Sequence, residues 1–257
     1  MDISWLALGL FMLVLIAPAA INRHYQLGLG REMLVAISRM TVQMLLVGIY
    51  LEFVFALDSL ALNLTWLAIM LVVGSSAIIG KAKLPKQTMF MPMTLGLLIG
   101  VTPILAILML GVFGPTPFYK AQFLIPTAGM LLGNSLSNNI IALTRLFDAF
   151  NEKQAEYQGA LALGATPTQA ATPFIQSAMQ QAFAPILASM ATTGIVSLPG
   201  MMTGQILGGS DPIVAVKYQI VILVAVLACI SLSVSSALWL TLKKLLNETG
   251  KMRFNRV

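Results

Sequence analysis

Apolar residues fill seven long runs that are separated by shorter polar intervals. The runs cover residues 3–21, 40–57, 64–80, 90–113, 123–143, 180–198 and 213–242. Each run reaches or approaches the ~20 residues that an α-helix needs to cross about 30 Å of hydrocarbon. The pattern therefore predicts an all-α, polytopic integral membrane protein, built as a bundle of about seven transmembrane helices.

Basic residues occupy alternate intervals between these runs. Thirteen of the 15 Lys and Arg residues follow the first, third, fifth or seventh run. They are Arg23, Arg31, Arg39, Lys81, Lys83, Lys86, Arg145, Lys153, Lys243, Lys244, Lys251, Arg253 and Arg256. Since basic loops stay in the cytoplasm, we expect the N-terminus outside and the C-terminus inside.

Composition supports the same class of protein. With 58% hydrophobic and 9% charged residues, a soluble domain of 257 residues is excluded. The net charge of +6 is spread over separate loops, so we assign it to topology and anionic lipid head groups, with no nucleic-acid partner. The first run lacks the basic start of a signal peptide, and it is kept as a span. No linker breaks the chain, and residues 1–257 are predicted to form one membrane domain.

The polar interval at about 145–175 carries strong helix-boundary signals. Gly164 suits the left-handed position that follows a helix. Thr166 can cap the next helix, with Pro167 at its first position and Gln169 completing a capping box. We therefore predict a cytoplasmic helix, a tight turn and a second helix that returns to the membrane. Asp211 and Pro212 repeat the start signal before the last run.

Three pairs of glycines have the spacing that lets membrane helices approach closely. They are Gly96 with Gly100, Gly129 with Gly133, and Gly204 with Gly208. Such pairs occur where helices associate within lipid, either inside one chain or between subunits.

The residues that catalysis or a resident metal would require are scarce. The chain has one His (His24), one Cys (Cys229) and nine dispersed acidic residues, too few for a His/Cys metal cage. Gly80-Lys81-Ala82 lacks the Ser or Thr of a nucleotide-binding loop. We therefore predict no catalytic residue, no metal ligand and no cofactor on this chain, and any ATP use must come from another polypeptide.

The fifth run is the most polar of the seven. Thr127, Asn134 and Asn138 are spaced to share one helical face. Such residues either bond to neighbouring helices or line a wet path. Met201 and Met202, just past the sixth run, offer thioethers that suit soft metal ions but also serve as flexible core filler.

Several sequence blocks resemble known transporter families. Ala160–Pro167 is similar to the coupling segment of ABC importer permeases. Further blocks, in order along most of the chain, resemble the FetB-type iron-export permeases, which include plant aluminium-tolerance relatives. These blocks are Pro126–Met130 with Gly133 and Asn134, Leu163–Pro167 with Gln169 and Ala170, Val196–Met202 with Gly204, and Asp211 and Pro212 with Ala215 and Lys217–Gln219.

The resemblance implies a multi-pass permease of the inner (plasma) membrane, not an enzyme, that exports iron or a related metal. It implies a homodimer with two copies of a separate ATPase subunit, which binds ATP and Mg²⁺. The residues expected to contact the ATPase are Ala160, Leu163, Gly164, Ala165, Thr166, Pro167 and Gln169. The candidate cargo path comprises Thr127, Met130, Asn134, Asn138, Met201 and Met202.

Three alternatives stay open on the sequence. The cargo can be a small organic or lipid-linked molecule, which needs no ligand cage. The chain can be a secondary transporter that works alone, although it lacks a buried acid pair for proton coupling. It can also be a membrane scaffold whose helix pair only docks a partner.

Overall fold

The computed structural model describes residues 3–246, and it divides between Leu57 and Asp58 into two compact units. We describe each unit by itself. The last three basic residues predicted to be cytoplasmic, Lys251, Arg253 and Arg256, lie outside the described residues.

The first unit is a pair of apolar helical segments. Its first segment consists of α1 (Trp5–Phe11), the 3₁₀ turn η1 (Met12–Leu15) and α2 (Ile16–His24), and its second is α3 (Gly30–Leu57). The Ser4 hydroxyl accepts a hydrogen bond from Ala7 N and so caps α1. Asn22 Oδ1 accepts from Leu29 N at 3.0 Å, which closes the turn between the two segments.

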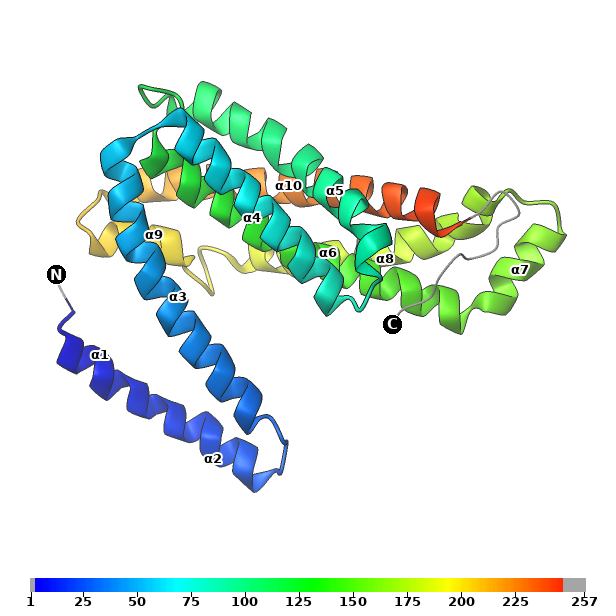
Figure 1. The fold of residues 1–257 in the computed structure, drawn as a ribbon, viewed down its shortest axis with the longest axis horizontal. Coiled ribbons are helices and arrows are strands. Elements are labelled where there is room, and N and C mark those ends of the chain that lie inside the picture. Colours follow the sequence, from blue (N-terminus) through cyan, green and yellow to red (C-terminus); the bar gives the residue numbers. More distant parts are fainter. Residues whose placement is uncertain (1–2, 247–257) are drawn as a thin grey trace. The chain divides into compact units, whose positions relative to one another are not determined.

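The second unit is a helical bundle. Its helices are α4 (Leu60–Lys81), α5 (Lys86–Ile107) with the π-helical end η2 (Leu108–Phe113), α6 (Ala121–Glu152), α7 (Gln154–Ala162), α8 (Pro167–Thr192), α9 (Gly200–Leu207) and α10 (Pro212–Leu245). Helix α10 packs against α5 and α6, and α6 packs in turn against α4 and α8 (Figure 1). The predicted all-α class is confirmed, because the described residues contain no β-strand.

Five helices of the described chain are long and apolar enough to cross a membrane. They are Trp5–His24, Gly30–Leu57, Leu60–Lys81, Lys86–Phe113 and Pro212–Leu245. The fifth and sixth apolar runs fall on α6 and α8, which are not among the five because polar residues recur along both. The predicted sixth run, 180–198, extends beyond the end of its helix. Helix α8 ends at Thr192, and residues 193–199 form a non-helical connection.

Most basic residues of the bundle lie at one of its ends, because of the directions in which its helices run. Helices α4, α6 and α10 end, and α5 and α8 begin, at the end of the bundle where α7 lies, called here the hairpin end (Figure 1). This end receives Lys81, Lys83, Lys86, Lys153, Lys243 and Lys244. The opposite end receives Asp58, Lys120 and Asp211. The one-sided charge pattern of the sequence therefore corresponds to one end of this unit.

The closest helix contact is the approach of α5 to α10. A β-carbon added at Gly96 would lie 2.8 Å from Ala237 Cβ, and one added at Gly100 would lie 2.6 Å from Ser233 Cβ and 2.9 Å from the Cys229 carbonyl oxygen. The first predicted glycine pair thus packs inside one chain. In the other two pairs, a β-carbon added at Gly133 or Gly204 would meet no atom within 4 Å in the described structure.

We expect Gly100→Ala to lower the stability of the protein. The added methyl has no room against α10, and overpacking costs about 1–3 kcal/mol, which exceeds the gain in helix propensity. Thermal unfolding of the full chain in detergent measures the effect. Gly74→Ala is the matched control, because its β-carbon would make an ordinary 3.6 Å contact with Leu97 Cδ1. Equal melting temperatures for the two variants would contradict the close-packing account.

Candidate functional site

The predicted helix–turn–helix is present at the hairpin end. Helix α7 ends at Ala162, and Gly164 adopts φ +92°, the left-handed conformation that glycine tolerates best. The Thr166 hydroxyl accepts from Gln169 N at 3.3 Å, and Gln169 Oε1 accepts from Thr166 N at 2.9 Å. With Pro167 at its first position, α8 begins as the sequence predicted.

An aromatic cluster fixes the hairpin to the end of the bundle. Phe150 of α6 contacts both Tyr157 of α7 and Phe174 of α8, with ring centroids 5.2 and 5.0 Å apart. All three side chains are buried, and burial raises the pKa of the Tyr157 hydroxyl. The cluster therefore packs α7 against both α6 and α8.

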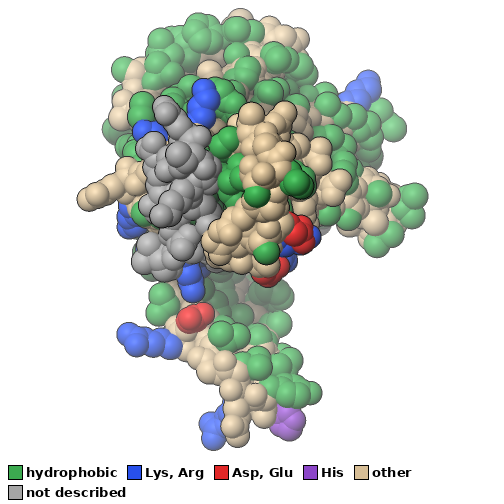
Figure 2. Space-filling model, turned by 90° about the vertical axis from the view of Figure 1, so that its right-hand side faces the viewer, with side chains coloured by type: hydrophobic (Ala, Val, Ile, Leu, Met, Phe, Trp, Pro, Cys, Tyr) green, Lys and Arg blue, Asp and Glu red, His purple; other side chains and the backbone are tan. Residues whose placement is uncertain are grey.

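The tip of this hairpin presents an apolar side chain to its surroundings. Leu163, at the turn, is 91% exposed. Ala160 and Ala165 are half-buried, and they pack against the hydrophobic core. Figure 2 looks onto this end and shows uncharged surface with a few hydrophobic side chains, bordered by acidic and basic groups. An exposed leucine on a rigid turn is suited to contact with a partner protein.

Helices α6 and α8 carry a polar exposed face. On α6 it includes Asn134 and Ser137, and on α8 it includes Gln176, Ser177, Gln180 and Gln181. A groove of about 660 Å³ runs between the two helices. Its lining residues are Ile140, Ile141, Thr144, Arg145, Asp148, Gln181, Ala184 and Pro185. The sequence reasoning missed the α8 amides, although the spacing of Gln176 and Gln180 by one helical turn is a signal for such a face.

A second cavity lies toward the opposite end, between the first half of α6, α9 and the start of α10. Its volume is about 580 Å³. It is lined by Phe113, Gln122, Phe123, Pro126, Thr127, Met130, Met201, Gln205, Ser210, Val214 and Tyr218. The structure thus brings together three of the six predicted path residues, Thr127, Met130 and Met201. Tyr218 belongs to a sequence block of the family resemblance, and Gln205 lies between the paired glycines Gly204 and Gly208, but the sequence predicted no role for either.

The other three predicted path residues have different surroundings. Asn134 is exposed, and its side-chain amide donates to the Met130 carbonyl of its own helix. Asn138 is buried, donates to the Asn134 carbonyl and keeps an Oδ1 without a hydrogen bond in the described structure. Met202 is half-buried and does not line the cavity. The two asparagines differ in burial because the neighbours of α6 change along its length.

A polar contact that the sequence did not single out joins α6 to α10. The amide of Asn139 donates to Ser233 Oγ and to the Ser135 carbonyl, both at 2.8 Å. Ser135 Oγ lies 3.2 Å from Cys229 Sγ. All four residues are buried, so this part of α6 serves helix packing rather than a wet path.

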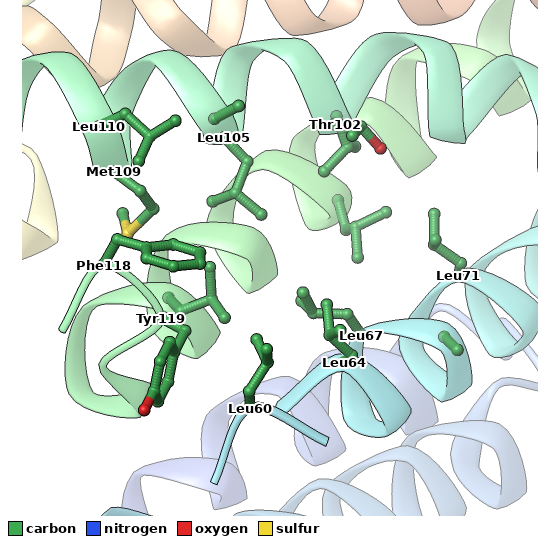
Figure 3. A pocket seen from close by; sticks show the side chains of 15 residues that line it. Leu60, Leu64, Leu67, Leu71, Thr102, Leu105, Met109, Leu110, Phe118 and Tyr119 are labelled. Atoms are coloured by element: carbon green, nitrogen blue, oxygen red, sulfur yellow. The ribbon is translucent and has the colours of Figure 1, made fainter. Parts of the chain in front are cut away.

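The third cavity has a different chemistry. It holds about 430 Å³ between α4, α5 and the start of α6. Leucines of α4 and α5 point into it together with Met109 and Phe118 (Figure 3). Thr102 and Tyr119 supply its few polar atoms. Such a lining is suited to hydrocarbon and offers little to a polar cargo.

No group of three or more His, Cys, Asp or Glu side chains that could hold a metal ion occurs among the described residues. Carboxylate and imidazole groups, which iron favours as ligands, are therefore not gathered in groups of three in the described part of the chain.

Comparison with known proteins gives clear relatives. Residues 5–246 match the uncharacterised protein family UPF0014. The chain is 33% identical to the UPF0014 membrane protein slr1647 of Synechocystis, over 90% of each chain. It is 32% identical to the probable iron export permease protein FetB of Escherichia coli, over 96% of this chain and 93% of that one. It is 31% identical to the protein ALUMINUM SENSITIVE 3 of Arabidopsis thaliana, over 86% and 83%. No solved structure matches.

We expect Ser233→Ala to lower the stability of the bundle by about 0.6–1.7 kcal/mol, the range measured for interhelical hydrogen bonds in membranes. The change leaves the Asn139 amide without its partner on α10. Ser235→Ala, at an exposed position on the same helix, should have no effect. Thermal unfolding in detergent measures both variants, and equal losses would show that the Asn139–Ser233 bond has no stabilising role.

Proposed function

Because the chain belongs to the UPF0014 family of membrane proteins, we propose that it is the permease subunit of an ABC transporter. The name of the Escherichia coli relative, a probable iron export permease protein, supports a role in export with iron or a related metal as cargo. In this proposal the chain is not an enzyme, and it lies in the inner (plasma) membrane.

The observation that carries the proposal is the hairpin. It projects from a bundle whose basic residues gather at the same end, and its turn exposes Leu163. A rigid turn with one apolar side chain can insert into a groove of a partner and transmit motion to the two helices that flank it. The segment Ala160–Gln169 is therefore assigned to contact with the ATPase, which binds ATP and Mg²⁺ in place of this chain.

The same proposal holds that the chain crosses the membrane seven times as one domain. Helices α6 and α8, with 32 and 26 residues, are about 48 and 39 Å long, enough to span the hydrocarbon. Helix α6 packs against α4, α5 and α10, and α8 packs against α10, and these three neighbours are apolar enough to cross. They therefore cross as well, and their polarity needs another explanation than exposure to lipid.

The polar face of α6 and α8 supports a homodimer. Exposed amides at membrane depth must be covered by protein or line a water-filled space. Asn134, Gln176, Gln180 and Gln181 are all exposed in the described bundle. A second copy facing this surface would cover it and enclose a polar path between the two permeases. Two permease chains then engage two ATPase subunits.

We expect Gly164→Val to uncouple transport from ATP hydrolysis. A valine at φ +92° strains the turn and displaces α8 from its capped start. Leu163→Glu, which leaves the backbone unchanged, should weaken binding of the ATPase by placing a charge in an apolar contact. Copurification of the ATPase and ATP hydrolysis in reconstituted vesicles measure both effects.

Gly159→Ala is the control for these hairpin variants. It lies on α7, with nothing within 4 Å of an added β-carbon, and should behave as wild type. If Gly164→Val and Leu163→Glu also retain the ATPase at wild-type yield, with hydrolysis stimulated as before, the hairpin is not the coupling element.

Topology gives an independent test of the seven crossings. In a Cys229→Ala background, cysteines introduced by Asp58→Cys and Asp211→Cys should react with an impermeant maleimide in intact cells. Those introduced by Lys83→Cys and Lys153→Cys should react only after permeabilisation, because basic ends stay in the cytoplasm. The opposite labelling pattern would show that the chain has the opposite orientation. Labelling of Asp58→Cys and Asp211→Cys on different sides would contradict the count of crossings.

A further inference from the structure

The cavity between α6, α9 and α10 is built for an organic molecule rather than a bare ion. Its volume of about 580 Å³ lies within the range of small-molecule sites, about 300–1,000 Å³. None of the described residues that line it is charged. Two side-chain amides, hydroxyls and thioethers are the available ligands, and an unpaired cation would lose its water without gaining a counter-charge.

One wall of this cavity is aromatic. The rings of Phe113 and Tyr218 are stacked with centroids 5.5 Å apart, and Phe123 lies 6.3 Å from Phe113. Met130 and Met201 add two flexible, polarisable side chains. Rings and thioethers together favour contact with a planar or polarisable group, because dispersion and sulfur–aromatic contacts are strongest there.

The cavity also contains a hydrogen-bond acceptor that the protein leaves unused. Gln205 Oε1, on α9, is buried and accepts no hydrogen bond within the described structure. A buried carbonyl oxygen without a hydrogen bond is destabilising, and a ligand with an N–H or O–H group would remove that cost once the Gln205 amide turns its oxygen toward the cavity. Gln205 lines the cavity with Thr127 and Tyr218, whose hydroxyls extend the polar part of the lining.

We infer that this cavity binds an uncharged organic group that carries a hydrogen-bond donor, with the donor directed to Gln205 Oε1 and the body of the group against the aromatic wall. Identifying this ligand as the cargo rests on the proposed transport function. If the cargo is iron, it enters this cavity inside a neutral complex whose own ligands surround the metal, and not as a free ion.

Three probes of similar shape but different charge test the effect of charge on binding. Benzamide is neutral and donates from its NH₂ group, benzoate is an anion without a donor, and benzamidinium is a cation with donors. The full chain, purified in detergent without any ATPase and labelled with ¹³C-methyl methionine, reports binding through the methyl signals of Met130 and Met201. Met89, buried at the hairpin end, is the reference signal that should not move.

We expect benzamide to shift the Met130 and Met201 signals and to bind about tenfold or more tightly than either charged probe, since burial penalises charge. Gln205→Leu should weaken benzamide about three- to tenfold, the loss expected for one hydrogen bond. Gln219→Leu is the matched control, because Gln219 on α10 also has a buried Oε1 without a hydrogen bond but does not line the cavity. Gln205→Glu should reverse the order in favour of benzamidinium.

Any of three results would overturn the inference: no shift with any probe, tightest binding of a charged probe to the wild-type protein, or undiminished benzamide binding by Gln205→Leu. The measurement needs neither ATP nor the partner subunit. A failure here would therefore leave the coupling role of the hairpin untouched, and hairpin variants that fail to uncouple transport would leave the ligand class untouched.

Discussion

The close approach of α5 to α10 is the contact on which the rest of the bundle depends. At Gly96 and Gly100 the backbone of α5 lies directly against the small residues Ala237 and Ser233 of α10, because association within lipid gains little from hydrophobic burial and depends on close packing. With α10 held there, its other face is buried against α6, where Asn139 bonds to Ser233. Helix α6 in turn carries the hairpin at one end and the aromatic-lined cavity at the other. One tight contact thus positions both candidate functional regions.

The second constraint is that polar groups at membrane depth need cover. It explains why two helices that are too polar to qualify as spans by composition nevertheless lie among helices that do qualify. It also separates two kinds of polar residue on α6. The Asn139 amide nitrogen donates to Ser233 and Ser135 inside the bundle, whereas Asn134 lies on a face that is exposed in the described structure. The hairpin and the exposed polar face are therefore the two surfaces on which the proposed ATPase contact and the proposed homodimer rest.

The chemistry of the cavities bears on the cargo. A relative is named as a probable iron export permease protein, yet no group of three or more His, Cys, Asp or Glu side chains that could hold a metal ion occurs among the described residues. The uncharged lining around Gln205 resolves this tension if the metal travels with its own ligands. The same cavity is suited to a purely organic cargo, so the probe experiment addresses the property that both cargoes share.

Local signals in the sequence determined the helical class, most helix boundaries and the turn at Gly164, because hydropathy, glycine conformation and capping depend on neighbours within a few residues. Thr166, Gln169 and Asp211 cap the helices that their spacing predicted. Tertiary structure alone decided which side chains share a cavity. Thr127, Met130 and Met201 meet Gln205 and Tyr218, while Asn134 and Asn138 differ in burial. Helical spacing places residues on a face of their own helix, but the packing of distant helices decides what that face meets at each height.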